Sequence, residues 1–147
     1  MVRNIHASAA VIGDRGVLVS GRSGMGKTSL AIALVDHARQ LGLFGRLVGD
    51  DQLLLSVRAG RLFCTAPAEI AGLAEIRGLG PVAVEHVGTA PVDLLVDLVE
   101  SAAAPRFPEA ATRLVAGCTV PLLVLAGGDT ASATRAVAAR LALAPFR

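Results

Sequence analysis

The sequence predicts an α/β domain with a mixed central sheet, β-hairpins and flanking helices, and three observations support this fold class. Short apolar runs bounded by turn-forming residues recur along the chain and predict strands. Residues 28–41 space their apolar side chains at helical intervals, and the alanine-rich residues 130–143 predict a second helix. The chain has 147 residues, enough for one hydrophobic core, and we expect residues 1–147 to form a single domain.

The chain is expected to open with a β-hairpin that leads into the first helix. The turn-rich tetrapeptide Gly13-Asp14-Arg15-Gly16 separates the apolar runs 9–12 and 17–19. The helix over residues 28–41 presents one apolar face, and Gly42 follows it where a C-terminal cap belongs.

A short buried strand over residues 45–49 is expected next, ending at Asp50 and Asp51. Glycine- and proline-rich loops are expected to separate the elements that follow. The sequence then predicts, in order, a hairpin of residues 53–57 and 61–64, a short helix at 67–73, a loop at 74–80, a strand at 92–99, a loop with Pro105 and Pro108 between Ser101 and Glu109, a strand at 120–125 and the closing helix.

Charge and cysteine spacing argue against several classes of protein. The net charge is +2, and no stretch interleaves basic with aromatic residues, so we expect no nucleic-acid partner. Cys64 and Cys118 lack the spacing of a zinc site and are expected to be buried, reduced thiols. The start of the chain up to His6 has no apolar signal segment, and residues 120–126 are too short to span a bilayer. We therefore expect a cytoplasmic protein without a membrane partner.

A phosphate-binding motif occupies residues 21–28 and fits G-x-x-x-x-G-K-[ST] between a predicted strand and a predicted helix. Its residues are Gly21, Arg22, Ser23, Gly24, Met25, Gly26, Lys27 and Thr28. Glycines let such a loop curl so that its backbone N–H groups converge on phosphate oxygens at the positive end of the helix. We expect Lys27, the only lysine, to reach the β- and γ-phosphates of ATP, and Thr28 to offer its hydroxyl to Mg²⁺. The expected fold is therefore P-loop NTPase-like.

Asp50 and Asp51 are the leading candidates for groups that act on a bound nucleotide. They end a predicted strand, and the carboxyl ends of strands line the ligand crevice of α/β folds. Repulsion between adjacent carboxylates next to Mg²⁺ can tune one of them as a base. The alternative, a solvated turn or a helix cap, is less favoured directly after a P-loop helix and a strand.

Other polar residues are harder to interpret from their pattern. Glu75 and Arg77 lie two positions apart in a glycine-punctuated segment and form either a structural ion pair or part of a metal and phosphate site. Asp93 and Asp97 interrupt an apolar run, so we expect them at solvated positions of a strand face. His6 taken alone is typical of a surface or capping residue.

Together these motifs resemble the short, single-domain form of the HPr kinase/phosphorylase family, which consists of the C-terminal catalytic domain alone. The resemblance covers residues 5–99 well and the remainder weakly. It rests on His6-Ala7, on the P-loop, on Val48-Gly49-Asp50-Asp51, and most specifically on Glu75-Ile76-Arg77-Gly78-Leu79-Gly80-Pro81, a segment that ordinary P-loop ATPases lack.

The resemblance implies an Mg²⁺-ATP-dependent protein-serine kinase that phosphorylates an HPr-like phosphocarrier protein and works as a homo-oligomer, often a hexamer. It implies that Asp51 is the proton acceptor and that Asp50 assists or substitutes for it. It further implies that Thr28 and Glu75 contact Mg²⁺, that Lys27 is the P-loop lysine, and that His6 and Arg77 support the site.

Two departures from the family pattern carry expectations of their own. Longer members have an additional N-terminal domain without a counterpart here. Any regulation that this domain carries is therefore expected to be missing. The family also has a catalytic arginine in a Gly-Arg-Asn loop after a Val-Pro strand, whereas residues 122–128 contain no arginine after Thr119-Val120-Pro121. We therefore expect phosphorolysis, the reverse reaction, to be weak or absent unless the fold brings Arg113 or Arg135 close.

Two other functions remain as alternatives. A small-molecule P-loop kinase would be expected to carry an arginine-rich lid, and between the Glu75–Pro81 segment and the closing helix only Arg106 and Arg113 occur. A nucleotide-dependent regulatory binding module would need no catalytic groups, and the intact acids and Lys27 argue against it.

Overall fold

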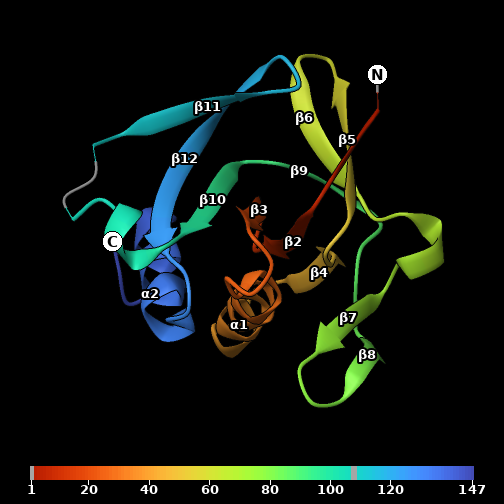
Figure 1. Cartoon of the computed structure of the whole chain (residues 1–147), viewed down its shortest axis with the longest axis horizontal. Coiled ribbons are helices and arrows are strands. Elements are labelled where there is room, and N and C mark those ends of the chain that lie inside the picture. The colour runs from red at the N-terminus through yellow and green to blue at the C-terminus, as the bar shows by residue number, and fades with distance from the viewer. Residues whose placement is uncertain (1, 107–108) are drawn as a thin grey trace.

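The computed structural model describes residues 2–106 and 109–147 (Figure 1). Its main sheet has six strands in the order β11-β12-β10-β3-β2-β4. Their bounds are β2 Ala7–Ile12, β3 Arg15–Gly21, β4 Gly45–Gly49, β10 Leu94–Val99, β11 Ala111–Val115 and β12 Cys118–Ala126. Strand β10 pairs in parallel with β3 and β12, whereas β2 pairs antiparallel with β3 and β4, and β11 antiparallel with β12. The expected α/β fold with a mixed sheet is confirmed.

The strand directions bring several loops to one edge of this sheet. Both β3 and β4 pair antiparallel with β2, so they run in the same sense, and β10 runs parallel to β3. The P-loop follows β3, Asp50 follows β4, and Glu100 follows β10. Segments far apart in the sequence therefore meet at the carboxyl ends of these strands, where α/β folds bind ligands.

Two helices and a second sheet cover the two faces of the main sheet (Figure 1). Helix α1, Lys27–Gln40, and helix α2, Thr130–Arg140, pack on one face, where Val17 and Val19 meet Leu30 and Leu34. The other face, including Leu18, packs against the antiparallel sheet β1-β5-β6-β9. The strands of that sheet are β1 Arg3–Ile5, β5 Leu53–Arg58, β6 Arg61–Thr65 and β9 Thr89–Pro91. Alternating side chains on β3 thus contribute to two separate cores.

A small hairpin of strands β7, Leu73–Ile76, and β8, Gly80–Ala83, stands beside the main sheet (Figure 1). The chain that follows it is fixed to β4 by the Leu47 amide, which donates to the Glu85 carbonyl over 3.3 Å. The hydrogen bond from Arg39, together with the charges of Arg39 and Arg46, lowers the pKa of the Glu85 carboxyl from its ordinary value. These contacts anchor the base of the hairpin next to the site.

Several sequence expectations need correction. The short helix expected at 67–73 is a single 3-10 turn, Ala68–Ile70, and the loop expected at 74–80 is mostly the β7–β8 hairpin. Strands β1, β9 and β11 were not expected. A 3-10 turn, Ser101–Ala103, lies in the predicted loop, and Pro108 lies outside the described residues. Cys64 and Cys118 are free thiols, Cys64 buried and Cys118 half-buried. No helix among the described residues is long and apolar enough to cross a membrane.

Candidate functional site

The P-loop connects β3 to α1 and leaves the start of the helix open to an anion. Gly24 and Gly26 have φ angles of 89° and 94°, a left-handed conformation that glycine adopts without strain. Gly26 caps helix α1 without a side-chain hydrogen bond, and the first turn contains no acidic residue. The free backbone N–H groups and the positive end of the helix dipole are therefore available to bind phosphate oxygens.

Lys27 is held against the loop that precedes it. Its ammonium group donates to the carbonyl oxygens of Gly21 and Arg22 over 2.9 and 3.3 Å, and the residue is only 8% exposed. The exposed Arg22 side chain pairs with Glu100. These contacts hold the only lysine of the chain at the mouth of the loop, where a bound phosphate would meet its charge.

The segment after β12 braces the P-loop from the other side. The Gly128 amide donates to the Met25 carbonyl over 3.2 Å, and the Gly127 amide donates to the Val99 carbonyl over 2.8 Å. A Cβ atom at Gly127 would lie 2.8 Å from the Met25 carbonyl oxygen, so a glycine is needed at this approach. The backbone of Gly127 and Gly128 thus packs closely against the P-loop at Met25.

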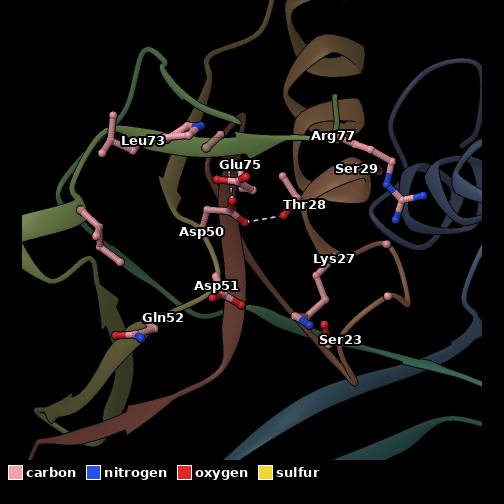
Figure 2. A pocket seen from close by; sticks show the side chains of 15 residues that line it. Ser23, Lys27, Thr28, Ser29, Asp50, Asp51, Gln52, Leu73, Glu75 and Arg77 are labelled. Atoms are coloured by element: carbon pink, nitrogen blue, oxygen red, sulfur yellow. Dashed lines mark hydrogen bonds between the residues drawn. The ribbon is translucent and has the colours of Figure 1, made fainter. Parts of the chain in front are cut away.

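Asp50 is the residue on which three elements converge (Figure 2). Its Oδ1 accepts hydrogen bonds from the hydroxyls of Ser8 on β2 and Thr28 on α1, both over 2.7 Å. Its Oδ2 accepts from the backbone amide of Glu75 on β7 over 2.8 Å. The residue is 6% exposed, and a buried carboxylate needs such donors to offset its lost hydration. Asp50 therefore joins the main sheet, the P-loop helix and the hairpin.

Asp51 has a different environment from its neighbour, although both belong to the predicted acidic pair. It is exposed, it lines the cavity, and its φ angle is 68°. This left-handed conformation is uncommon outside glycine, although aspartate tolerates it better than most residues. The side chain of Asp51 is thus free to act on a ligand, whereas that of Asp50 is engaged by its three donors.

Glu75 and Arg77 face the P-loop across a cavity of about 690 Å³. Its wall includes Lys27, Thr28, both aspartates and the hairpin residues Glu75, Arg77 and Pro81. The ion pairs of the described residues do not include one between Glu75 and Arg77, so the structural ion pair considered from the sequence is not formed. The hairpin instead contributes one acidic and one basic side chain to the same cavity.

His6 is not among the residues that line the cavity. It is exposed at the bend between β1 and β2. The next residue, Ala7, donates its amide to the Asp51 carbonyl over 3.2 Å, so the backbone at His6 runs close to the acidic pair. The supporting role that the resemblance implies for His6 stays a prediction.

Asp93 and Asp97 are not at the solvated positions expected from the sequence. Asp93 accepts from the Gly16 amide over 2.8 Å and pairs with Arg61 over 2.8 Å. Asp97 accepts from the Ser20 hydroxyl over 3.2 Å and pairs with Arg113 over 3.0 Å. Their side chains are 19% and 20% exposed, and these hydrogen bonds and ion pairs offset the loss of hydration at such half-buried positions.

Ser8 is a site residue that the sequence did not indicate. It lies between two alanines in an apolar strand, where a serine looks like a small filler. The structure shows it fully buried, with its hydroxyl donating to Asp50 and accepting from the Asp51 amide over 3.3 Å. No spacing rule links Ser8 to a residue 42 positions away, so only the tertiary fold reveals the contact.

A strand, a glycine-rich loop and a helix beside an acidic strand end define this chain as a P-loop nucleotide-binding domain. The family model described as HPr Serine kinase C-terminal domain matches residues 1–104, and the chain belongs to this family.

Known relatives agree with this assignment. The chain is 32% identical over 102 residues to the HPr kinase/phosphorylase of Mycoplasma mycoides, covering 65% of this chain and 31% of that protein. With the HPr kinase/phosphorylase of Clostridium tetani it shares 35% identity over 76 residues, 52% of this chain and 23% of the relative. The chain thus spans less than a third of the length of these curated relatives.

A solved structure covers more of the chain. The structure of the Hpr(Ser) kinase/phosphatase from Coxiella burnetii superposes with a TM-score of 0.78 at 26% identity, covering 92% of this chain and 93% of that one. The structural similarity therefore extends beyond residues 1–104, which the family model matches.

Proposed function

We propose that the chain is an Mg²⁺-ATP-dependent protein-serine kinase that transfers the γ-phosphoryl group to a serine of an HPr-like phosphocarrier protein. One observation carries the proposal: a single cavity joins the P-loop, the Asp50-Asp51 pair and the Glu75–Pro81 hairpin segment. A P-loop alone is compatible with many reactions, whereas this combination is the one that the family resemblance predicted. Family membership and the names of the relatives support the reaction and the phosphocarrier substrate.

The nucleotide would bind with its phosphates on the P-loop. The uncapped start of α1 and the Lys27 ammonium group supply positive charge to the phosphate oxygens. Mg²⁺ bound in such sites has one or two protein ligands beside phosphates and water, and it neutralises charge on the transferred group. Thr28 and Glu75 line the cavity with a hydroxyl and a carboxylate, which are oxygen donors that suit this hard cation.

Asp51 is the proposed proton acceptor. The serine oxygen attacks the γ-phosphorus, the bond to the β–γ bridging oxygen breaks, and the serine proton passes to the Asp51 carboxylate. Asp50 is less suited to this step because both of its oxygens already accept hydrogen bonds from Ser8, Thr28 and Glu75. Its proposed role is to hold Thr28 and the Glu75 backbone in place. Arg77, with its fixed positive charge in the cavity wall, is proposed to stabilise the transferring group.

The phosphocarrier partner can be identified directly. Purified protein is incubated with Mg²⁺-ATP and a panel of HPr-like proteins, and phosphoserine is detected by mass spectrometry. We expect one phosphoserine on the phosphocarrier, at least about 100-fold slower formation with Lys27→Ala, and none on a phosphocarrier whose target serine is alanine. Labelled small molecules, or ATP binding without transfer, would refute the proposal and favour the two alternatives weighed from the sequence. We also propose that the protein is cytoplasmic and forms a homo-oligomer; native mass spectrometry would test the number of subunits.

The reverse reaction is proposed to be weak or absent. Phosphorolysis needs an anion site for the attacking inorganic phosphate, and residues 122–128 after the Val-Pro strand carry no charge. Arg113 is paired with Asp97, and Arg135 donates to the Ser132 hydroxyl over 3.2 Å, and neither lines the cavity. Phosphoserine-carrying substrate incubated with phosphate and Mg²⁺ should release little pyrophosphate. Rapid release would show that an arginine reaches the site from elsewhere.

A further inference from the structure

The Ser8 hydroxyl is the only side-chain group that contacts both members of the acidic pair in the described structure. It donates to Asp50 Oδ1 over 2.7 Å and accepts from the Asp51 amide over 3.3 Å. Ser8 is 0% exposed and lies on β2 between the buried residues Ala7 and Ala9. A buried hydroxyl is costly unless it is hydrogen-bonded, and here both its donor and its acceptor capacity are used.

The contact to Asp51 bears on the unusual backbone of that residue. At a φ angle of 68°, Asp51 would relax toward an extended conformation unless its peptide groups were held. Two contacts from the start of β2 hold them: the Ser8 oxygen accepts from the Asp51 amide, and the Ala7 amide donates to the Asp51 carbonyl over 3.2 Å. The direction of the Asp51 side chain into the cavity therefore depends on β2.

We propose that Ser8 is a positioning residue that sets the geometry of both aspartates for phosphoryl transfer, an inference that rests on the proposed kinase function. One hydroxyl orients the Asp50 carboxylate toward Thr28 and fixes the left-handed backbone of Asp51. Alanine at this position would keep the packing of β2 and lose both contacts. Threonine would keep both contacts.

The test compares Ser8→Ala and Ser8→Thr with a matched control, Ser20→Ala. Ser20 lies on the neighbouring strand β3 and also donates to an aspartate, Asp97, over 3.2 Å, but it does not touch the acidic pair. Steady-state kinetics should show kcat lowered about tenfold in Ser8→Ala, a loss typical of misplaced catalytic groups, with KM for ATP nearly unchanged. Ser8→Thr should restore most of kcat, and Ser20→Ala should keep kcat within about twofold of wild type.

A double-mutant cycle distinguishes positioning from general stability. If Ser8 acts through Asp51, then Ser8→Ala should have no further effect on kcat in an Asp51→Asn background. Wild-type kcat in Ser8→Ala, an additive effect in the cycle, or an equal kcat loss in Ser20→Ala would each overturn the proposal. Should Ser8→Ala fail to fold, Ser8→Cys, which retains only a weak donor and a weak acceptor, replaces it with the same expectations.

A structural measurement separates this inference from the kinase proposal. Backbone chemical shifts and scalar couplings of Asp51 report its φ angle without any need for activity. In Ser8→Ala we expect the left-handed conformation to be lost, and its retention would overturn the positioning role. The two proposals can therefore fail separately. If the wild type phosphorylates no phosphocarrier but Ser8→Ala still loses the left-handed conformation of Asp51, the kinase function is refuted and the positioning of Asp51 by Ser8 is upheld.

Discussion

Replacing Asp50 by alanine is expected to destabilise the protein strongly, because the substitution leaves buried donors without an acceptor. Three groups lose their partner: the Ser8 hydroxyl, the Thr28 hydroxyl and the Glu75 amide. Thr28 lines the cavity and can turn to water, so it contributes little to the loss. Ser8 is fully buried and cannot do so, and a hydrogen bond to a charged group is worth about 1.5–3 kcal/mol. The Glu75 amide is only part-buried, so its lost hydrogen bond costs about 1 kcal/mol. We therefore expect the free energy of unfolding to fall by about 2.5–4 kcal/mol.

Urea denaturation followed by far-UV circular dichroism suits this measurement, since the chain has no Trp or Tyr for fluorescence. The control is Asp51→Asn, which keeps a side chain that tolerates the left-handed conformation and removes only an exposed charge. We expect that control to change the free energy of unfolding by less than about 0.5 kcal/mol while lowering kcat by about 10²–10⁴-fold, the usual cost of losing a general base. An effect below about 1 kcal/mol for Asp50→Ala, or equal effects for both variants, would refute the division of roles between the two aspartates.

Three further predictions concern single side chains. Lys27→Ala should lower phosphoryl transfer by about 10²–10³-fold and leave the protein folded, because it removes the ammonium group at the phosphates; normal turnover would contradict the P-loop assignment. Glu75→Gln should raise the Mg²⁺ concentration needed for half-maximal activity, since an amide is a poorer ligand than a carboxylate; an unchanged titration would make Glu75 a structural residue. Burial raises the pKa of the Cys64 thiol from 9.0 to about 12, because the folded protein favours the protonated thiol. The stabilisation that this thiol contributes is therefore complete below pH 9.0 and is lost as the pH rises toward 12. A thiol reagent should accordingly label the half-buried Cys118 before Cys64, and the opposite order would show that Cys64 is not protected.

Elements with a local signal were predictable from the sequence. The strand expected at 45–49 is β4, Gly45–Gly49, and the helix expected at 28–41 is α1, Lys27–Gln40. Gly42 has a φ angle of 76°, as a residue after a helix C-terminus often does. Between β5 and β6, where the sequence predicts a hairpin, Ala59 and Gly60 both have positive φ angles. In each case apolar spacing and a turn residue were enough to locate the element.

Elements that depend on tertiary contacts were missed. Strand β11 buries almost none of its side chains, because it lies at the edge of the sheet, so its sequence shows no apolar alternation. Glycines made residues 74–80 look like a loop, whereas pairing between β7 and β8 and the bond from the Glu75 amide to Asp50 order them as a hairpin. The cavity residues of the P-loop, the acidic pair and the Glu75–Pro81 segment were named from motifs. Leu73 and Ala74 of the same hairpin, and the separate environments of Asp50 and Asp51, were not.

The hydrogen bond between the Glu75 amide and Asp50 also makes the motion of the hairpin measurable by hydrogen exchange. That amide hydrogen exchanges with solvent deuterium only when the hydrogen bond opens. Its exchange rate therefore reports the opening of β7 away from the acidic pair. The carboxylate that accepts the bond also accepts the hydroxyl of Thr28, the residue at the start of the P-loop helix. A ligand that binds Thr28 on the P-loop therefore acts on a group that shares its acceptor with the Glu75 amide. The exchange rate of this one amide, compared with and without ligand, reports how occupancy of the P-loop changes the motion of the hairpin.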